Sequence, residues 1–171
     1  MVEADGGYGV VESLTFVHQP QVMYNLTVAG AHTYFVGEQQ WLVHNDCDRA
    51  ALASNLGSQV GDDLQAHHLI PCEYCDEPII GQAERGGFNF NGSENGILLP
   101  DNLGLSAQMN LPSHSGSHPV YSADVGTEIT RLNQASQRYR WTPQQAYQAV
   151  TDLAGRLRNN IIRMGGGVRL E

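Results

Sequence analysis

The chain has 171 residues, of which 41% are hydrophobic, and its formal net charge at neutral pH is −9. This apolar content supports a folded core and excludes global disorder, and no apolar run is long enough to span a membrane, so we expect no membrane insertion. The negative charge counts against a nucleic-acid partner unless basic residues are concentrated locally, because the neutralisation of phosphates supplies most non-specific affinity for nucleic acids.

Residues 8–44 carry Val, Thr, Tyr and Phe in short alternating runs that glycines separate. The clearest runs are Tyr24–Val28, Thr33–Val36 and Trp41–Val43. Such alternation is typical of a small antiparallel β-meander. After Asn45 the composition changes to Ala, Asp, Ser and Gln without alternation, so we place a domain boundary between Asn45 and Asp46. This gives a first domain at 1–45 and a second at 46–171.

Three blocks of the first segment occur in order: Val22–Val28, His32–Val36 and Leu42–Asn45. Together they resemble the C-terminal end of a Hint domain, the intein-like autoprocessing module that precedes toxin domains in bacterial polymorphic toxins. The resemblance implies that the Asn45 side chain attacks its own carbonyl and cleaves the Asn45–Asp46 bond, while His44 polarises that bond. The half of a Hint domain that carries the nucleophile is missing, so we expect a remnant with weak or absent self-cleavage. A β-rich extension with an unrelated ending is the alternative.

The second segment contains four of the seven histidines, and two of them, His67 and His68, are adjacent. Hydrolysis of a phosphodiester with one metal ion needs a cation near the scissile phosphate and a base that activates water. Neutral imidazole can serve as either group near physiological pH. On an extended strand the two side chains point to opposite faces and cannot easily bind the same ion. We therefore expect one ring to be a metal ligand and the other a base.

Cys72 and Cys75 form a C-x-x-C pattern directly after this pair. A structural zinc ion needs four ligands, and the chain contains only one other cysteine, Cys47. An odd number of cysteines in a chain of this length argues against a disulfide scaffold. We therefore interpret them as ordinary loop cysteines. A zinc knuckle that borrows His67 or His68, and a redox pair, are the alternatives.

Asn95-Gly96 is a strong turn signal, and the apolar run Ile97–Pro100 follows it. This run can pair with the strand of His67 and His68 as a β-hairpin. Asn95 could serve only as a turn residue, or it could both form the turn and take part in the site.

A helix is predicted to begin at Pro119, because proline suits the first helical position. Its buried stripe is marked by apolar residues spaced by four and three, Val125, Ile129 and Leu132. His118 then lies at or next to the N-cap, and His114 lies in the turn that leads into the helix. A hairpin followed by a helix, with histidines on both, is the outline of a ββα-metal site.

Three motifs occur in order along this segment: Ala66-His67-His68, Asn95-Gly96 and the run from His114 to His118, which Tyr121 follows. Over roughly residues 64–135 they resemble the AHH family of toxin nucleases, within the HNH/endonuclease VII superfamily. The resemblance implies metal ligands at His67, His114 and His118. It also implies that His68 is the general base, and that Asn95 braces the hairpin and orients this base.

The last predicted helix begins at Thr142-Pro143-Gln144-Gln145, which combines an N-cap, a first-turn proline and a capping-box glutamine. Its apolar face would be formed by Ala146, Val150, Leu153, Leu157 and Ile161. This helix should pack against the ββα unit.

Positive charge is concentrated in this C-terminal segment. The chain has no lysine, and seven of its nine arginines follow residue 130 against two acidic residues, so residues 131–171 carry seven minus two, or about plus five charges. Arg156, Arg158 and Arg163 are therefore candidate phosphate contacts. A solvated helix face with snorkelling arginines is an equally good interpretation.

Together these patterns predict an α+β protein: a ββα-metal nuclease core with additional C-terminal helices, preceded by a small antiparallel β segment from a Hint domain. We expect an endonuclease toxin that hydrolyses DNA with one divalent metal ion, which could be Zn, Mg, Mn or Ni. RNA exposes the same phosphate, so the sequence alone does not separate the two substrates. A cognate immunity protein is the expected second partner.

The first residues lack the basic start and apolar stretch of a classical signal peptide. We therefore expect an effector that is secreted or delivered by another route and acts in the cytoplasm of a target cell. Two alternatives come from other classes of protein: a zinc-stabilised binding module without turnover, and a self-processing fragment that cleaves after Asn45.

Overall fold

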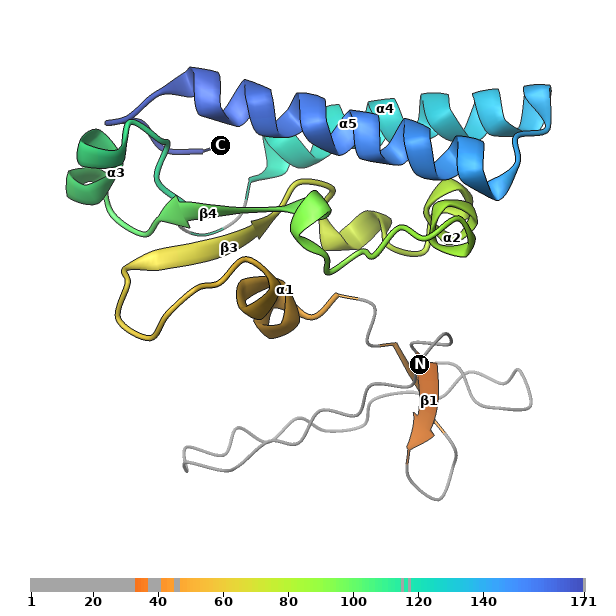
Figure 1. Cartoon of the computed structure of the whole chain (residues 1–171), viewed down its shortest axis with the longest axis horizontal. Coiled ribbons are helices and arrows are strands. Elements are labelled where there is room, and N and C mark those ends of the chain that lie inside the picture. The colour runs from red at the N-terminus through yellow and green to blue at the C-terminus, as the bar shows by residue number, and fades with distance from the viewer. Residues whose placement is uncertain (1–32, 37–40, 45–46, 115, 117, 171) are drawn as a thin grey trace. The chain divides into compact units, whose positions relative to one another are not determined.

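A computed structural model of the chain (Figure 1) describes residues 33–36, 41–44, 47–114, 116 and 118–170. The chain divides into two compact units, Met1–Asp46 and Cys47–Glu171. This division lies one residue beyond the boundary predicted after Asn45. Within the described part, no helix is both long and apolar enough to cross a membrane.

In the first unit, strand β1 (Thr33–Val36) pairs antiparallel with β2 (Trp41–His44), and Thr33 lies opposite His44. These are two of the three runs that the sequence predicts as strands. The predicted strand at Tyr24–Val28 and the proposed cleavage residue Asn45 lie outside the described residues. The origin of this segment in a Hint domain stays a prediction.

The second unit combines helices with a two-stranded sheet, which is the α+β class that the sequence predicts. Its elements in chain order are α1 (Arg49–Asn55), β3 (Leu64–His68), η1 (Cys72–Tyr74), α2 (Pro78–Arg85), η2 (Ser93–Asn95), β4 (Gly96–Pro100), α3 (Leu103–Met109), α4 (Pro119–Tyr139) and α5 (Pro143–Met164). The sequence predicts β3, β4, α4 and α5. It does not predict the short helices α1, α2 and α3.

Strands β3 and β4 pair antiparallel, with His68 opposite Gly96 and Leu64 opposite Pro100. The predicted pairing is therefore confirmed, although η1, α2 and η2 lie between the two strands in the sequence. Gly96 lets α1 pack closely on this sheet, because a Cβ atom there would lie 2.5 Å from Cδ1 of Leu52. Leu52 is fully buried, so α1 closes one face of the hairpin.

Helices α4 and α5 lie side by side along the other side of the hairpin (Figure 1). Helix α4 begins at Pro119 with His118 as its N-cap, as predicted. Helix α5 begins with the predicted capping box, in which Thr142 and Gln145 each accept a hydrogen bond from the other's backbone N–H. The box satisfies two of the donors that the start of a helix leaves unpaired.

Two apolar clusters hold these elements together. The larger joins α2, α4 and α5 through residues such as Ile80, Ile129 and Val150. The smaller lies between the hairpin and α5 and contains Leu69, Leu99, Ala154, Ile161 and Leu170. Leu170 brings the C-terminal segment to the hairpin, where its backbone N–H donates to the carbonyl oxygen of Ser113 at 2.9 Å. Leu170, near the C-terminal end of the chain, therefore packs beside the histidines that precede α4.

Candidate metal centre and active site

The three histidines predicted as metal ligands converge in the structure. His67 lies near the end of β3, His114 lies in the segment before α4, and His118 caps α4. One ring nitrogen from each lies within 4.8 Å of the other two. All three residues are at most 9% exposed. This spacing allows one ion to bind all three rings after small rotations of their side chains.

Hydrogen bonds on the outer side of two rings decide which nitrogen is available. His118 Nδ1 donates to the carbonyl oxygen of Leu170 at 2.7 Å, and His114 Nδ1 lies 3.0 Å from Oε1 of Gln65. A ring whose Nδ1 carries the proton presents a bare Nε2, and such outer partners also fix the orientation of ligand rings. Both rings are therefore held in the tautomer that binds a metal ion through Nε2.

Two ring nitrogens in this group are buried without a partner. His67 Nε2 and His118 Nε2 form no hydrogen bond with any residue that the structure describes. Burial, and then the charges of His114 and His118, lower the pKa of His67 to about 2. Burial lowers the pKa of His114 to about 4. An unpartnered buried polar atom is unfavourable, so these neutral rings with bare nitrogens fit a divalent cation.

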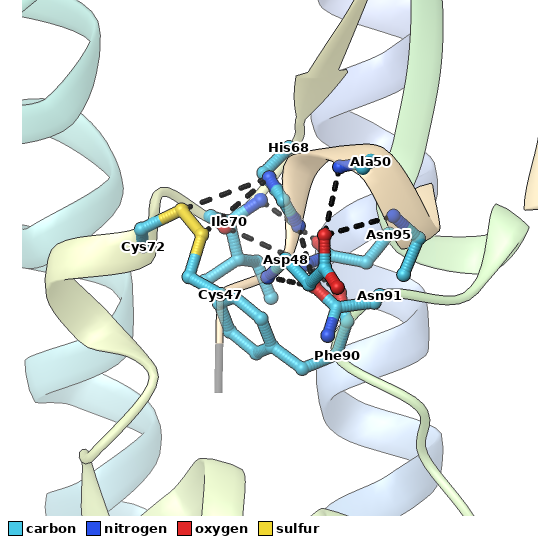
Figure 2. Close-up of a disulfide and its surroundings, with 10 residues drawn as sticks. Cys47, Asp48, Ala50, His68, Ile70, Cys72, Phe90, Asn91 and Asn95 are labelled. Carbon is cyan, nitrogen blue, oxygen red and sulfur yellow. Dashed lines mark hydrogen bonds between the residues drawn. A yellow bond between two sulfur atoms is a disulfide. The ribbon is translucent and has the colours of Figure 1, made fainter. Parts of the chain in front are cut away.

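His68 lies on the opposite face of β3, as the alternation of a strand requires. Its Nε2 is 3.0 Å from Oδ1 of Asn91, and the backbone N–H of Asp48 donates to the same oxygen at 3.0 Å (Figure 2). Because that oxygen is an acceptor, His68 Nε2 carries the proton and Nδ1 is bare. Burial lowers the pKa of His68, and the hydrogen bond to Asn91 opposes this effect. The ring thus keeps one nitrogen that can accept a proton.

Asn95 is fully buried and braces the chain directly after β3. Its Oδ1 accepts from the N–H of Ile70 at 2.8 Å, and its Nδ2 donates to the carbonyl oxygen of Phe90 at 2.9 Å. The side chain that holds the His68 ring is Asn91, which is not among the site residues predicted from the sequence. The Asn-Gly dipeptide at 91–92 is the turn signal that could have drawn attention to it. Asn95 thus forms hydrogen bonds with the chain around the hairpin, and the hydrogen bond of the His68 ring is formed with Asn91; the role of Asn95 in catalysis stays a prediction.

Cys47 and Cys72 form a disulfide, and Cys75 lies outside it. The prediction of ordinary loop cysteines is therefore wrong for this pair, and so is the alternative of a redox pair within C-x-x-C. Cys72 and Cys75 bracket one turn of 3₁₀ helix, whereas Cys47 reaches Cys72 from the start of the second unit, 25 residues earlier. Spacing along the sequence carries no signal for such a long-range pairing.

Both faces of β3 open to one cavity of about 220 Å³. Its lining includes the four histidines together with Cys72, Tyr121 and Arg49. Arg49 begins α1, and its positive charge contributes to lowering the pKa of all four histidines. A guanidinium at this position suits a phosphate group. Arg49 is not among the arginines that the sequence predicts as phosphate contacts, which all lie in the C-terminal segment.

The C-terminal arginines lie elsewhere. Arg156 and Arg163 line a larger hollow of about 620 Å³ between α4 and α5. Glu128 lies in this hollow, 3.9 Å from Arg156, and reduces its positive charge. Arg158 donates from Nη2 to three backbone carbonyl oxygens around η2 and the start of β4, so it holds that turn in place. Phosphate contact by these arginines stays a prediction, and the four histidines line the smaller cavity instead.

An antiparallel pair of strands and a following helix thus present three neutral imidazoles around one point and a fourth on the opposite strand face. These features form a candidate metal centre in an α+β fold. The sequence profile of the AHH family, a nuclease family of the HNH/ENDO VII superfamily with conserved AHH, matches residues 51–157.

That match spans more than half of the chain, so the chain belongs to the AHH family, and Ala66-His67-His68 is its AHH motif. Family membership identifies a hydrolytic nuclease that acts on nucleic acid, from a superfamily of metal-dependent enzymes. No curated protein and no solved structure gives a significant match to the chain.

Proposed function

We propose that this domain is a metal-dependent endonuclease toxin that hydrolyses DNA. His67, His114 and His118 would hold one divalent cation, and His68 would be the general base. The observation that carries the proposal is the division at β3, where three imidazoles gather on one face and a fourth, oriented by Asn91, lies on the other. A bound ion and a separate base are the groups that phosphodiester hydrolysis needs.

The residues that line the cavity would have different roles in hydrolysis. His68 Nδ1 accepts a proton from a water molecule, and the hydrogen bond from its Nε2 to Asn91 stabilises the imidazolium that forms. His67, His114 and His118 would hold the divalent cation, which would supply positive charge to stabilise the scissile phosphate and the leaving oxygen. Arg49 adds a fixed positive charge at the cavity wall. Burial keeps His67 unprotonated at neutral pH, so its lone pair remains available.

The ligand set also bears on which ion binds. Three imidazoles favour the later divalent transition metals, so Zn²⁺ and Ni²⁺ should bind more tightly than Mn²⁺, and Mg²⁺, which prefers oxygen ligands, should bind least tightly. Cellular availability then decides which ion the enzyme uses. Ion competition measured by calorimetry would rank the four candidates.

The toxin role rests on the segment upstream of the nuclease. Its Hint-like blocks would place a processing module there, and β1 and β2, which overlap two of these blocks, form an antiparallel pair. Cleavage after Asn45, assisted by His44, would release a nuclease that acts in the cytoplasm of a target cell. A producing cell would then need an immunity protein, and the released segment 46–171, with 14 acidic residues against nine arginines and so about five net negative charges, would suit a basic inhibitor.

Cleavage of plasmid DNA tests the nuclease proposal. The wild-type chain should cut plasmid with a divalent ion and lose this activity in EDTA, whereas His68→Ala should keep the metal and fail to cut. Parallel assays with RNA test the choice of substrate. Failure of the wild-type chain to cut DNA with Zn²⁺, Ni²⁺, Mn²⁺ or Mg²⁺ would overturn the proposal. If the chain also retains zinc, that result favours the binding module without turnover.

Mass spectrometry of the purified chain tests the processing step separately. An intact mass would show that the Asn45–Asp46 bond is not cleaved in this chain, as we expect for a remnant. A fragment beginning at Asp46 that is lost in Asn45→Ala would instead support self-processing.

A further inference from the structure

A second cluster of metal-ligating atoms lies on the His68 face of β3. It consists of Sγ of Cys47, Sγ of Cys72 and Nδ1 of His68, all within 4.8 Å of one another. The two sulfurs lie 3.8 and 3.7 Å from Nδ1 and are joined in a disulfide (Figure 2). The three-histidine site shares none of these atoms.

The contact between His68 and the disulfide brings three acceptors together. Because Oδ1 of Asn91 receives the N–H of Asp48, His68 donates to it through Nε2 and its Nδ1 carries no proton. A disulfide sulfur carries no proton either, so no hydrogen lies between Nδ1 and the two sulfurs. The ring therefore directs a lone pair toward the sulfurs with no positive group between them. A cation shared by the nitrogen and two thiolates would satisfy all three atoms.

We propose that reduction of the Cys47–Cys72 disulfide creates a second metal site, formed by Cys47, His68 and Cys72, for a thiophilic divalent ion such as Zn²⁺. A dithiol reductant supplies the two electrons and two protons that convert the disulfide into two thiols, and is itself oxidised to a disulfide. Binding of the ion then releases the two thiol protons to solvent. Two thiolates and one imidazole are three of the four ligands of tetrahedral zinc, and water can take the fourth position.

The surrounding structure holds these ligands in place before an ion binds. Cys47 directly precedes Asp48, whose carboxylate caps α1 by accepting two backbone N–H groups. Asn91 fixes both the His68 ring and the backbone of Asp48, and such an outer partner is what orients a histidine ligand. Cys72 lines the cavity and both cysteines are partly exposed, so a reductant or an ion can reach them.

Occupation of this site has a consequence for catalysis, which rests on the proposed function. The ion would bind His68 Nδ1, the atom that accepts the proton in the proposed mechanism. A nitrogen that binds an ion cannot accept a proton, so zinc at this second site would inhibit DNA cleavage. The three-histidine site would keep its own ion, because β3 separates the two ligand sets.

Titration with Co²⁺ tests the second site directly, because cobalt bound to thiolate gives a near-ultraviolet charge-transfer band that cobalt bound only to imidazole lacks. The reduced full chain, freed of metal, should bind two equivalents of Co²⁺, one of them with this band. The oxidised chain should bind one equivalent without it. A reduced chain that shows no thiolate band at saturating Co²⁺ would overturn the proposal.

Four variants assign the band to its ligands. Cys47→Ser and Cys72→Ser should each weaken or abolish it, and Cys75→Ser is the matched control that should retain it. His67→Ala should retain the band while losing the imidazole-only equivalent, and this keeps the test informative if a cysteine variant fails to fold. Loss of the band in Cys75→Ser, with retention in Cys47→Ser, would contradict the assignment.

Inhibition is measured separately, in the reduced chain with a large excess of Mn²⁺ as the activating ion, so that Mn²⁺ keeps the three-histidine site although Zn²⁺ binds imidazoles more tightly. One added equivalent of Zn²⁺ should reduce plasmid cutting at least about tenfold in the wild type, since general-base catalysis is worth more than this. The double variant Cys47→Ser/Cys72→Ser should be much less affected, and equal inhibition of the two proteins would contradict inhibition through this site. If no form of the chain cuts DNA, the proposed function fails, whereas the cobalt band still decides whether the second metal site exists.

Discussion

The two faces of β3 place the same side chain in two different environments. On one face His67 meets other imidazoles, with ring centroids 4.9 Å from His114 and 5.6 Å from His118. On the other face His68 meets an amide oxygen and a disulfide. Buried imidazoles that disfavour one another's charge stay neutral and offer lone pairs to an ion. A ring whose Nε2 proton is held by an amide instead keeps one nitrogen for proton transfer.

Adjacency in the sequence produces this separation because side chains alternate along a strand. Two histidines spaced by two residues would share a face and compete for the same ion. In the described sheet β3 pairs with β4 on one edge only, and the cavity is lined by β3 residues rather than by β4. One strand can therefore bring a ligand and a base to one cavity from opposite faces.

Removal of one ring from each face should give the largest effects. In the oxidised chain, His118→Ala should lower metal affinity by more than about 100-fold, because a direct ligand is lost. Loss of a residue that only holds a ligand in place lowers metal affinity by at most about 100-fold. His68→Ala should leave metal affinity unchanged and lower the cutting rate by roughly 10²- to 10⁴-fold. Calorimetry with Ni²⁺ and plasmid cleavage measure the two quantities. Loss of the metal in His68→Ala would show that the two faces are not independent.

We call the face of β3 where His67 lies near His114 and His118 the metal face, and the face that carries His68 the base face. The dependence of stability on acid pH should arise mainly from the metal face. Unfolded histidines titrate near pH 6.5, whereas the folded pKa is about 2 for His67 and about 4 for His114. Below pH 6.5 the unfolded chain binds more protons than the folded chain, so the free energy of unfolding falls as pH falls, until the folded rings also protonate. Between pH 7.5 and pH 5.5, the two residues together should lower the free energy of unfolding by about 3 kcal/mol.

Urea denaturation of the metal-free chain at these two pH values measures this loss. His67→Gln should remove about half of it, because the substituted side chain does not titrate. A free energy of unfolding that is the same at both pH values would contradict the assignment of neutral, buried rings to this face.

Changes to the outer partners should have smaller effects that differ between the faces. Gln65→Ala should lower metal affinity by about 10- to 100-fold, because His114 loses the partner that fixes its tautomer. Asn91→Ala should lower kcat by roughly tenfold with metal affinity unchanged, because His68 loses its orientation. Asn159→Ala, which removes an amide in the α4–α5 hollow, is the matched control. If Gln65→Ala and Asn91→Ala both changed metal affinity, or both changed only kcat, the two faces would not have separate roles.

The metal face could be predicted from the sequence more completely than the base face. The hairpin and α4 follow from local signals, because Asn95-Gly96 marks a turn and Pro119 marks a helix start. Once these elements are placed, the positions of His67 on the strand and of His118 at the start of the helix can be predicted. The capping box of α5 is likewise a local signal, and the structure confirms it.

The base face depends on contacts between segments far apart in the chain. Asn91 reaches His68 across 23 residues, and Cys47 reaches Cys72 across 25. Helix α1 and the segment before it supply Cys47, Asp48 and Arg49, yet seven helical residues with no long apolar period give a weak signal. Tertiary contacts of this kind have no periodicity, so the sequence predicts that a base exists and does not predict what surrounds it.

Arg49 should give the smallest effect, and it acts on both faces, since its charge contributes to the lowered pKa of His67 and of His68. We expect Arg49→Ala to raise KM for DNA by roughly two- to fivefold at low salt, because an exposed cation mainly adds long-range attraction to phosphate. Steady-state cutting rates measured at several salt concentrations test this. Arg131→Ala, which removes an exposed arginine paired with Glu128 on α4, is the control and should change KM less.

The salt dependence distinguishes two roles for Arg49. Long-range attraction is screened over about 8 Å at physiological ionic strength, so the difference between Arg49→Ala and the wild type should shrink as salt rises. A direct contact that forms only with the reacting phosphate would instead lower kcat by a similar factor at every salt concentration. That result would place Arg49 with His68 in the catalytic machinery, and the base face would then contribute both the proton acceptor and a positive charge to the reaction.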